Sequence, residues 1–575
     1  MFSLLWEEHY KTKNLIFYLP KLMFYKIFGN TSLPYTFSFS IEGNQKNINK
    51  SKGKSINNSN SNSNGDNNNH TYGRRQKLGL VLGPLLLLLI LLIPSPPGMT
   101  IEAQKMAAIT AIMVTWWICE SVPIPVTSLL PLILMPLLGL TSTAKAAIPY
   151  ASDIIFLYMG GFFIALAMQR WNLHKRIAMN IIKIIGFSPN RLVLGFMIAC
   201  AAISAFVSNT ATAVMMMPIG LAVISHVIDE GKKEGLDKDI DFSQGNFHFG
   251  MNLMLGIAYA CSVGGIATII GTPPNAILVG FLKQTYGYEI TFTKWLLIGV
   301  PAVIIMIPLI WFVLTRINPP ELKKIPGGRD IIEEQLRLLG KLTPGERWTA
   351  VIFFFTAFCW IFSAFIKKIF SNPAFFSDAT IAMIGGILLF LIPIDLKRGI
   401  FLLDWEWAKK IPWGILLLFG GGLSMADGFA TTKLDLWIGQ QIMLLQHLPL
   451  LILIIGVVVL SVLLTETTSN TATAAMLMPI LAAVAIAIGQ NPLLLVIPAV
   501  IIDSCAFMLP VSTPPNAVVF GTGYVTIPQM VRNGVWCDVA CVVIVVILTY
   551  LIVVPFFGIT IGELPSWVST HMIVK

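Results

Sequence analysis

Charge is scarce in this sequence. Only 12% of its 575 residues are Asp, Glu, Lys or Arg, whereas 55% are hydrophobic; this balance excludes an ordinary soluble domain and indicates a membrane protein. The net charge of +10 requires no nucleic-acid partner, because basic residues of multi-span proteins collect in cytoplasmic loops. Cysteine is also scarce. The seven cysteines are odd in number and lie in or beside apolar runs, which favours small buried apolar side chains over a disulfide framework.

Two short motifs stand out against this apolar background, because each occurs twice and in the same order. The segment Ser208–Ala213 recurs letter for letter at Ser469–Ala474. The segment Thr272–Ala276, which reads TPPNA, recurs at Thr513–Ala517. Two paired signals in one order predict that half of the chain is a duplicate of the other half.

The spacing of the copies supports this duplication. The offset of 261 residues between the two SNT motifs also carries Ser204 onto Thr465 and Gly160-Gly161 onto Gly421-Gly422. At the TPPN motif the offset has shortened to 241 residues, and most of the difference is explained by a charged insert around residues 231–246 of the first copy.

The duplication divides the chain into four parts. Residues 1–76 form an Asn- and Ser-rich extension that is too polar to bury a core, so we expect it to be disordered. Residues 77–315 form the first half, 316–347 a cytoplasmic linker and 348–575 the second half. Basic residues before the first span, before the first SNT motif and in the linker predict that these three regions and the N-terminus are cytoplasmic.

Apolar segments long enough to cross a bilayer follow one another from Lys77 onward, and two of them are expected near Val126–Leu140 and Gly414–Met425. Five crossings separate the two SNT motifs, and this odd number inverts the second half relative to the first. The expected fold is therefore all-α and polytopic, an inverted repeat of about 11 transmembrane helices with two re-entrant helical hairpins. Inverted repeats with interrupted helices are typical of secondary transporters, whose binding site lies near the membrane midplane.

The two motifs supply chemistry for binding a cation and an anion together. Ser, Asn and Thr offer neutral oxygens inside an apolar run, where polar groups are tolerated only within the protein or beside a cavity. Pro273 and Pro274 remove two N–H donors and disfavour helix at Thr272, which leaves carbonyl oxygens for a hard monovalent cation. The helix that resumes afterwards presents N–H groups and a positive dipole end to an anion.

Fixed positive charge is missing around both motif pairs. No Lys or Arg occurs at 192–231, 239–282 or 434–531, and the seven histidines all lie outside the motifs. A dianion bound there must be balanced by mobile cations, so that the binding of each depends on the other. This dependence favours a cotransporter over a membrane-embedded enzyme, which would need a nucleophile with a base or a metal cluster.

The doubled SNT signature with a TPPN motif after each copy resembles the divalent anion:sodium symporter family, and within it the bacterial-type sodium-dependent dicarboxylate transporters. Trp116–Pro125 and Gly420–Gly422 add to the resemblance, which extends from Lys77 to the C-terminus. It implies a homodimer with a scaffold domain and a moving transport domain, elevator-type alternating access, and SNT motifs at the tips of the re-entrant hairpins. The implied activity is sodium-coupled import of a small dicarboxylate such as succinate, malate or fumarate across the plasma membrane, without an organic cofactor.

The resemblance also assigns residues to sites. It implies a first sodium site at Ser204, Ser208, Asn209 and the backbone of Gly271, and a second at Thr465, Asn470 and the backbone near Thr468 and Ser512. The substrate carboxylates are expected at eight motif residues: Ser208, Asn209, Thr210, Thr272, Ser469, Asn470, Thr471 and Thr513. The two copies differ where Ser512 replaces Gly271, which matters if the backbone there requires a positive φ.

Three other kinds of transport are compatible with these motifs. A proton-coupled or exchange carrier would use Glu466 and Asp503, acids in apolar stretches whose alternative is a hydrogen-bonded structural role. A sodium-coupled carrier for citrate or sulfate would use the same motifs, because the sequence does not define the size of the cavity. A channel differs from all of these in that its uptake is neither saturable nor stoichiometrically coupled.

Overall fold

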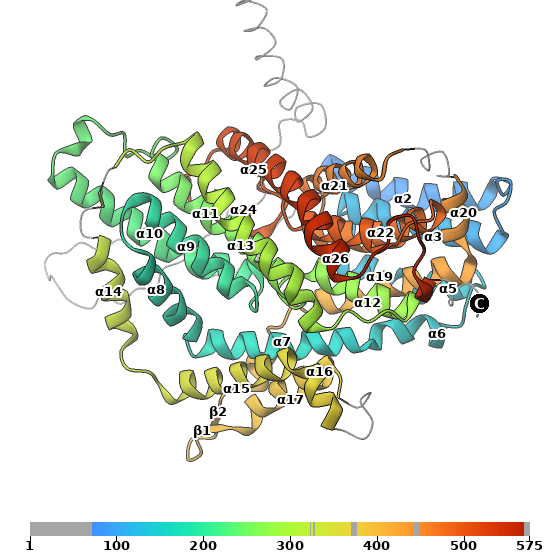
Figure 1. The fold of residues 1–575 in the computed structure, drawn as a ribbon, viewed down its shortest axis with the longest axis horizontal. Helices are drawn as coiled ribbons and strands as arrows, with labels where there is room; N and C mark the ends of the chain where they lie inside the picture. The colour runs from blue at the N-terminus through green and yellow to red at the C-terminus, as the bar shows by residue number, and fades with distance from the viewer. Residues whose placement is uncertain (1–71, 323, 326–327, 370–375, 442–447, 569–575) are drawn as a thin grey trace, which may run out of the picture. The chain divides into compact units, whose positions relative to one another are not determined.

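The computed structural model describes residues 72–575 apart from 323, 326–327, 370–375, 442–447 and 569–575 (Figure 1). The chain separates into two compact units, Met1–Leu78 and Gly79–Lys575. The extension expected at 1–76 lies outside the described residues up to residue 71, and helix α2 (Arg74–Leu92) begins before the expected boundary. The elements that follow α2 all belong to the second unit.

The first half is a succession of helices. In chain order they are α3 (Ile101–Cys119), α4 (Ile124–Thr127), α5 (Leu130–Leu137), α6 (Thr143–Ala147), α7 (Asp153–Arg170), α8 (Leu173–Ile185), α9 (Pro189–Ser204), α10 (Asn209–Lys233), α11 (His248–Gly264), α12 (Pro273–Tyr286) and α13 (Phe292–Ile317). The single span expected at 126–140 is divided between α4 and α5, because Pro131 cannot donate the hydrogen bond that would continue the helix.

The linker and the second half are also helical. They contain α14 (Gly328–Leu339), α15 (Pro344–Ile361), α16 (Ser363–Ile366), α17 (Asp378–Leu391), α18 (Trp405–Ala408), α19 (Trp413–Thr432), α20 (Leu434–Gln441), α21 (Leu450–Thr467), α22 (Asn470–Ala487), α23 (Leu493–Asp503), α24 (Pro514–Phe520), α25 (Ile527–Leu548) and α26 (Val554–Phe556). A short antiparallel pair, β1 (Pro393–Asp395) and β2 (Ile400–Phe401), is a small departure from the all-α expectation.

Nine helical segments within the described residues are long and apolar enough to cross a membrane. Four further apolar segments are shorter, namely Ile124–Leu137, α9, α17 and α23. All seven cysteines are free and six of them are buried, in agreement with their interpretation as apolar side chains. The chain is therefore a multi-span helical membrane protein.

The two halves exchange helices. Helix α12 of the first half packs against α22 and α23 of the second, whereas α24 of the second half packs against α10 and α11 of the first (Figure 1). By the offsets of the repeat, α10, α11 and α12 correspond to α22, α23 and α24. The two sets of contacts are therefore equivalent: each half contributes its TPPN helix to the SNT helix and the following helix of the other half.

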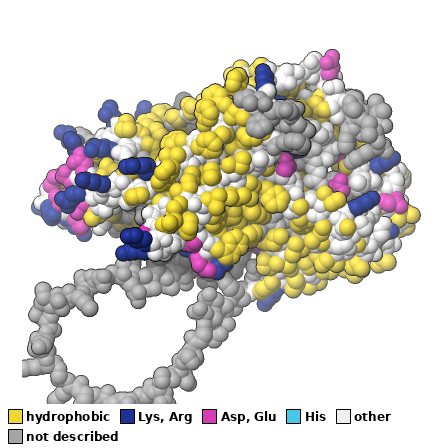
Figure 2. Space-filling view, turned by 90° about the horizontal axis from the view of Figure 1, so that it is seen from below, with side chains coloured by type: hydrophobic (Ala, Val, Ile, Leu, Met, Phe, Trp, Pro, Cys, Tyr) yellow, Lys and Arg dark blue, Asp and Glu magenta, His cyan; other side chains and the backbone are white. Residues whose placement is uncertain are grey.

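One face of the second unit is strongly apolar. In Figure 2, hydrophobic side chains cover much of the face on which α15 and α17 lie, and charged side chains gather at one end of it. The exposed apolar side chains on these two helices include Phe354, Phe355, Phe358, Ile387 and Leu391. Large aromatic and aliphatic groups turned outward are expected of a surface in contact with lipid.

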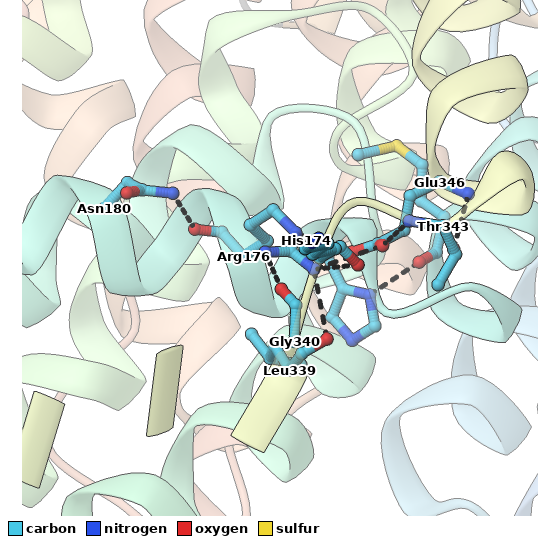
Figure 3. A network of polar contacts seen from close by, with 9 residues as sticks. His174, Arg176, Asn180, Leu339, Gly340, Thr343 and Glu346 are labelled. Carbon is cyan, nitrogen blue, oxygen red and sulfur yellow. Dashed lines mark hydrogen bonds and ion pairs between the residues drawn. The ribbon is translucent and has the colours of Figure 1, made fainter. Parts of the chain in front are cut away.

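A polar network fastens the linker to the first half (Figure 3). Arg176 on α8 donates from Nε to Glu346 Oε1 at 2.7 Å and from Nη2 to Glu346 Oε2 at 3.2 Å. The same guanidinium also donates to the carbonyl oxygens of Leu339, Gly340 and Lys341. Glu346 in turn forms a capping box with Thr343 at the start of α15. Beside this network, burial lowers the pKa of His174 to about 4, so that its ring is neutral.

Replacing Glu346 with glutamine is expected to lower the free energy of unfolding by about 2–3 kcal/mol, because Arg176 loses a buried charged partner. Burial by itself raises the pKa of the Glu346 carboxyl, but hydrogen bonds from Arg176 and Thr343 outweigh it and hold the pKa below its ordinary value. The stabilisation is therefore complete above the pKa of an unfolded glutamate and is lost as the pH falls through the lower folded value.

Denaturant unfolding of the detergent-solubilised protein at several pH values measures this effect. Glu334→Gln is the control, because Glu334 forms an exposed ion pair with Arg337 and the loss of such a pair should be nearly neutral. Equal destabilisation by the two substitutions would contradict the assignment.

Candidate functional site

Each copy of each motif lies where a helix begins. Ser208 and Ser469 are the N-caps of α10 and α22, and Thr272 and Thr513 are the N-caps of α12 and α24. The two prolines of each TPPN motif occupy the first turn, where the missing N–H would have no partner within the helix anyway. The motifs therefore combine helix N-termini, which carry partial positive charge, with non-helical backbone before them.

In the first half, two residues expected in a sodium site contact each other. Ser204 Oγ lies 2.6 Å from Asn209 Oδ1 and 2.7 Å from the carbonyl oxygen of Cys261. Asn209 Oδ1 also faces the break between α11 and α12. A methyl group added to Gly265 would lie 2.7 Å from Asn209 Oδ1 and 3.0 Å from the carbonyl oxygen of Gly271. Neutral oxygens from two interrupted segments thus converge on a space smaller than a methyl group.

The break between α11 and α12 is held in shape by buried side chains. Three of them donate to its carbonyl oxygens: Asn275 to Gly265, Ile266 and Thr268, Tyr158 to Ile269 and Thr272, and Trp295 to Ile266. These bonds replace the helical bonds that the prolines interrupt, so the carbonyls keep fixed directions. Tyr158 and Trp295 lie far from the motifs in sequence and were not among the expected residues.

The second half repeats this arrangement. Thr465 Oγ1 lies 2.7 Å from Asn470 Oδ1 and 2.8 Å from the carbonyl oxygen of Asp503, as Ser204 does with Asn209 and Cys261 in the first half. Asn516 Nδ2 donates to the carbonyl oxygens of Ala506 and Leu509 at 2.9 and 3.1 Å, the counterparts of the bonds that Asn275 makes to Gly265 and Thr268. The sequence repeat is thus a repeat of hydrogen bonds.

The asparagines of the two TPPN motifs were absent from the expected site. Asn275 and Asn516 are fully buried, and the Oδ1 atom of each has no hydrogen-bond partner in the part of the chain that the structure describes. Their occurrence in a repeated motif was the available signal, because both copies keep Asn after the proline pair. Each site therefore contains a buried asparagine whose Nδ2 atom donates hydrogen bonds to the carbonyl oxygens of the break and so fixes their positions.

The replacement of Gly271 by Ser512 does not reflect a positive φ, because Gly271 is not among the glycines with that conformation. Glycine is needed at 271 for close approach, since an added methyl group would collide with the carbonyl oxygen of Gly265. In the second copy the Ser512 side chain is accommodated and donates to the carbonyl oxygen of Leu509 at 2.7 Å. The two breaks therefore differ in local packing.

A carboxylate also contacts the second break, which lies between α23 and α24. Glu466 accepts hydrogen bonds from the backbone N–H groups of Phe507, Met508 and Leu509. Its counterpart in the first half is Ala205, so the two sites differ in this charge. The contacts support the structural alternative for Glu466, whereas the buried Asp503 carboxyl accepts no hydrogen bond from any described residue.

The remaining expected residues are placed in different ways. Thr210 is exposed and Thr471 is half-buried, so both are open to a ligand beside the helix N-termini. The Thr468 hydroxyl contacts Thr473 Oγ1 at 2.6 Å rather than Asn470, which leaves only its backbone for the second site. Within the described residues, no Lys or Arg side chain takes part in the hydrogen bonds of either site.

The described residues give no direct hydrogen bond between Asn209 and Asn470. The two sites are connected through helices, because α12 begins at the first break and packs against α22, which begins at Asn470. A second connection is the Tyr259 hydroxyl on α11, which donates to the carbonyl oxygen of Phe507 in the second break at 2.7 Å.

Interrupted membrane helices arranged around buried neutral oxygens define a membrane transport protein. The chain matches the model of the sodium:sulfate symporter transmembrane region over residues 75–558. It is 43% identical over 494 residues to the sodium-dependent dicarboxylate transporter SdcS of Staphylococcus saprophyticus, covering 86% of this chain and 94% of the relative. It is 42% identical over 490 residues to SdcS of Staphylococcus aureus strain USA300, covering 85% and 93%. The chain therefore belongs to the divalent anion:sodium symporter family, as the motifs predict.

A solved structure supports the fold at low sequence identity. MtrF of Neisseria gonorrhoeae, described as illuminating a class of antimetabolite efflux pumps, aligns with a TM-score of 0.50 at 13% identity, covering 84% of this chain and 96% of that one. This likeness concerns the fold alone.

Proposed function

We propose that this protein is a sodium-coupled symporter that imports small dicarboxylates, with four-carbon acids such as succinate, malate and fumarate as its substrates. The observation that carries the proposal is the pair of equivalent oxygen clusters, Ser204 with Asn209 and Thr465 with Asn470, each beside a break in a buried helix. Neutral oxygens suit alkali ions, and a substrate dianion is then held by bound sodium and helix N-termini instead of basic side chains. The names of the two staphylococcal relatives support sodium and dicarboxylate as the coupled pair.

The proposed sites use the motif residues in separate roles. The first sodium ion is bound by Ser204, Ser208, Asn209 and the backbone of Gly271, and the second by Thr465, Asn470 and the backbone of Thr468 and Ser512. The substrate carboxylates contact the two SNT motifs and the N-cap threonines of the TPPN motifs, namely Ser208, Asn209, Thr210, Thr272, Ser469, Asn470, Thr471 and Thr513. Sodium ions that bind before the substrate lower the free-energy cost of bringing the doubly charged dicarboxylate into the membrane.

The proposed fold is an inverted repeat with hairpins that enter and leave the membrane on one side, and two features support a two-fold relation between its halves. The reciprocal packing of α12 and α24 is the pattern of an isologous contact, in which each half presents the same surface to the other. The rings of Tyr158 and Phe419, which are related by the offset of 261 residues, contact each other edge to face at 4.8 Å. A residue can contact its own repeat counterpart only close to the axis that relates the halves.

The proposed assembly is a homodimer in the plasma membrane with a cytoplasmic N-terminus, and each subunit has a fixed scaffold and a transport domain that moves as an elevator. The cytoplasmic placement of both basic regions is supported by their proximity, because Lys183 on α8 lies 3.3 Å from Glu333 in the linker and Arg176 bonds Glu346. The family supports the remaining features of this proposal.

Uptake of labelled succinate into proteoliposomes tests the proposal. An inward sodium gradient is expected to drive saturable accumulation above equilibrium, whereas potassium or a pH gradient alone is not. Sodium-independent accumulation driven by pH would instead favour the proton-coupled carrier, for which the unpaired Asp503 carboxyl is the relevant group. Competition by unlabelled citrate and sulfate separates the dicarboxylate specificity from the other sodium-coupled alternatives, and non-saturable flux would indicate a channel.

A further inference from the structure

An apolar groove runs along the outside of the second unit between α13 and α25. The groove is open, with a volume of about 450 Å³, and all of its lining residues are apolar except Arg316. Its walls include Phe312 and Val313 from α13 and Trp536, Val539 and Val543 from α25, and four of these five side chains are about half exposed. Both helices are long and apolar enough to span a membrane, so the groove opens toward lipid.

The two helix ends at one end of the groove are fixed together. Asn318, directly after α13, donates from Nδ2 to Asn533 Oδ1 at 2.6 Å, and Asn252 Nδ2 donates to the Asn318 carbonyl oxygen at 2.6 Å. All three asparagines are buried. The C-terminal end of α13 and the first turns of α25 therefore stay at a fixed distance from each other.

Two arginines belong to this same end. Arg316 precedes Asn318 by two residues and lines the groove, with its guanidinium 5.3 Å from the ring centre of Phe312. Arg532 precedes Trp536 by one helical turn, on the exposed face of α25 that continues through Val539. Both arginines are exposed, and neither forms an ion pair with any described residue. An apolar groove thus ends in two free positive charges beside an exposed tryptophan.

We propose that this groove binds one phospholipid with an anionic head group, whose acyl chain lies along Phe312, Val539 and Val543 and whose phosphate contacts Arg316 and Arg532. Guanidinium groups match phosphate oxygens in geometry as well as charge, and exposed tryptophan is typical of the level of the head groups. The basic linker that follows α13 assigns this end to the cytoplasmic leaflet, where anionic lipids are concentrated. Inorganic phosphate could bind the two arginines, but it has no apolar chain to fill the groove.

Binding of labelled phosphatidylglycerol to the purified full-length protein in detergent tests the proposal, with phosphatidylcholine and inorganic phosphate as competitors. The double substitution Arg316→Gln with Arg532→Gln is expected to weaken phosphatidylglycerol binding at least fivefold. The control is Arg329→Gln with Arg337→Gln, which removes the same charge from exposed positions on α14, outside the groove, and should leave binding unchanged. Val543→Trp fills the groove without altering charge and is expected to weaken binding to a similar extent.

Several outcomes would overturn the proposal. An equal loss in the α14 control would mean that general surface charge attracts the lipid, and equal affinity for phosphatidylcholine would remove the role of the arginines. Displacement by millimolar phosphate, with no effect of Val543→Trp, would indicate a simple anion site. A change in oligomeric state with Val543→Trp would assign the groove to a second copy of the chain. Thermal unfolding of each variant verifies that the helices remain assembled.

Discussion

Asn209→Ala and Asn470→Ala are each expected to reduce sodium-driven succinate uptake more than about 100-fold, because each removes from a proposed sodium site an oxygen that is worth about 3 kcal/mol as a ligand and hydrogen-bond acceptor. Each Oδ1 accepts from the hydroxyl five residues before it, Ser204 in the first half and Thr465 in the second. The loss should occur in both variants, because the proposed function requires sodium at both sites to balance the charge of the substrate dianion.

Initial rates in proteoliposomes across a sodium titration measure this effect. Asn180→Ala is the matched control, because Asn180 is an exposed asparagine on α8, and its amide donates to the carbonyl oxygen of Arg176, away from both motif pairs. The control should transport normally, and all three variants should elute as folded protein. Retention of half the normal rate by either Asn209→Ala or Asn470→Ala would contradict the assignment of these residues to the sites.

Glu466→Gln is expected to lower uptake about 30-fold and to raise the sodium concentration needed for half-maximal rate, from the loss of about 2 kcal/mol in charge-assisted hydrogen bonds. The carboxylate accepts hydrogen bonds from the three backbone N–H groups of residues 507–509. The glutamine amide would place its own N–H donor against at least one of these donors. The second break would then lose the contact that fixes the N–H groups of residues 507–509.

The sodium dependence distinguishes this role from proton coupling. If Glu466 only shapes the second site, Glu466→Gln should weaken sodium binding and leave the pH profile of the residual uptake unchanged. If Glu466 carries a coupled proton, the substitution should instead abolish the pH dependence without altering the sodium requirement. Glu334→Gln on the exposed face of α14 makes the same chemical change away from the sites and should have no effect on transport.

Much of the site could be predicted because the sequence repeats itself. A shared offset predicts that Ser204 and Thr465 play equal roles, and the structure gives them the same two contacts. The offset cannot predict contacts that occur only once. Tyr158 contacts the first break at a residue 111 positions away in sequence, and Glu466 contacts the second break at a residue 41 positions away. No periodic pattern in the sequence predicts either contact.

Fold boundaries were predictable where apolar runs are continuous and less so where proline divides them. Helix α19 begins within one residue of the expected span at Gly414, although it continues to Thr432. The expected span at 126–140 became two short helices, because proline removes a donor without reducing hydropathy. Hydropathy alone therefore overstates the continuity of such segments.

The exchange of α12 and α24 between the halves also bears on how the protein is made. Synthesis proceeds from the N-terminus, so α12 enters the bilayer before its neighbours α22 and α23 exist. The surfaces of α10, α11 and α12 that contact the second half therefore stay uncovered until the last quarter of the chain has been synthesised. Truncation just before α24 should therefore leave both oxygen clusters incompletely packed, including the Ser204–Asn209 cluster, whose own residues are all present.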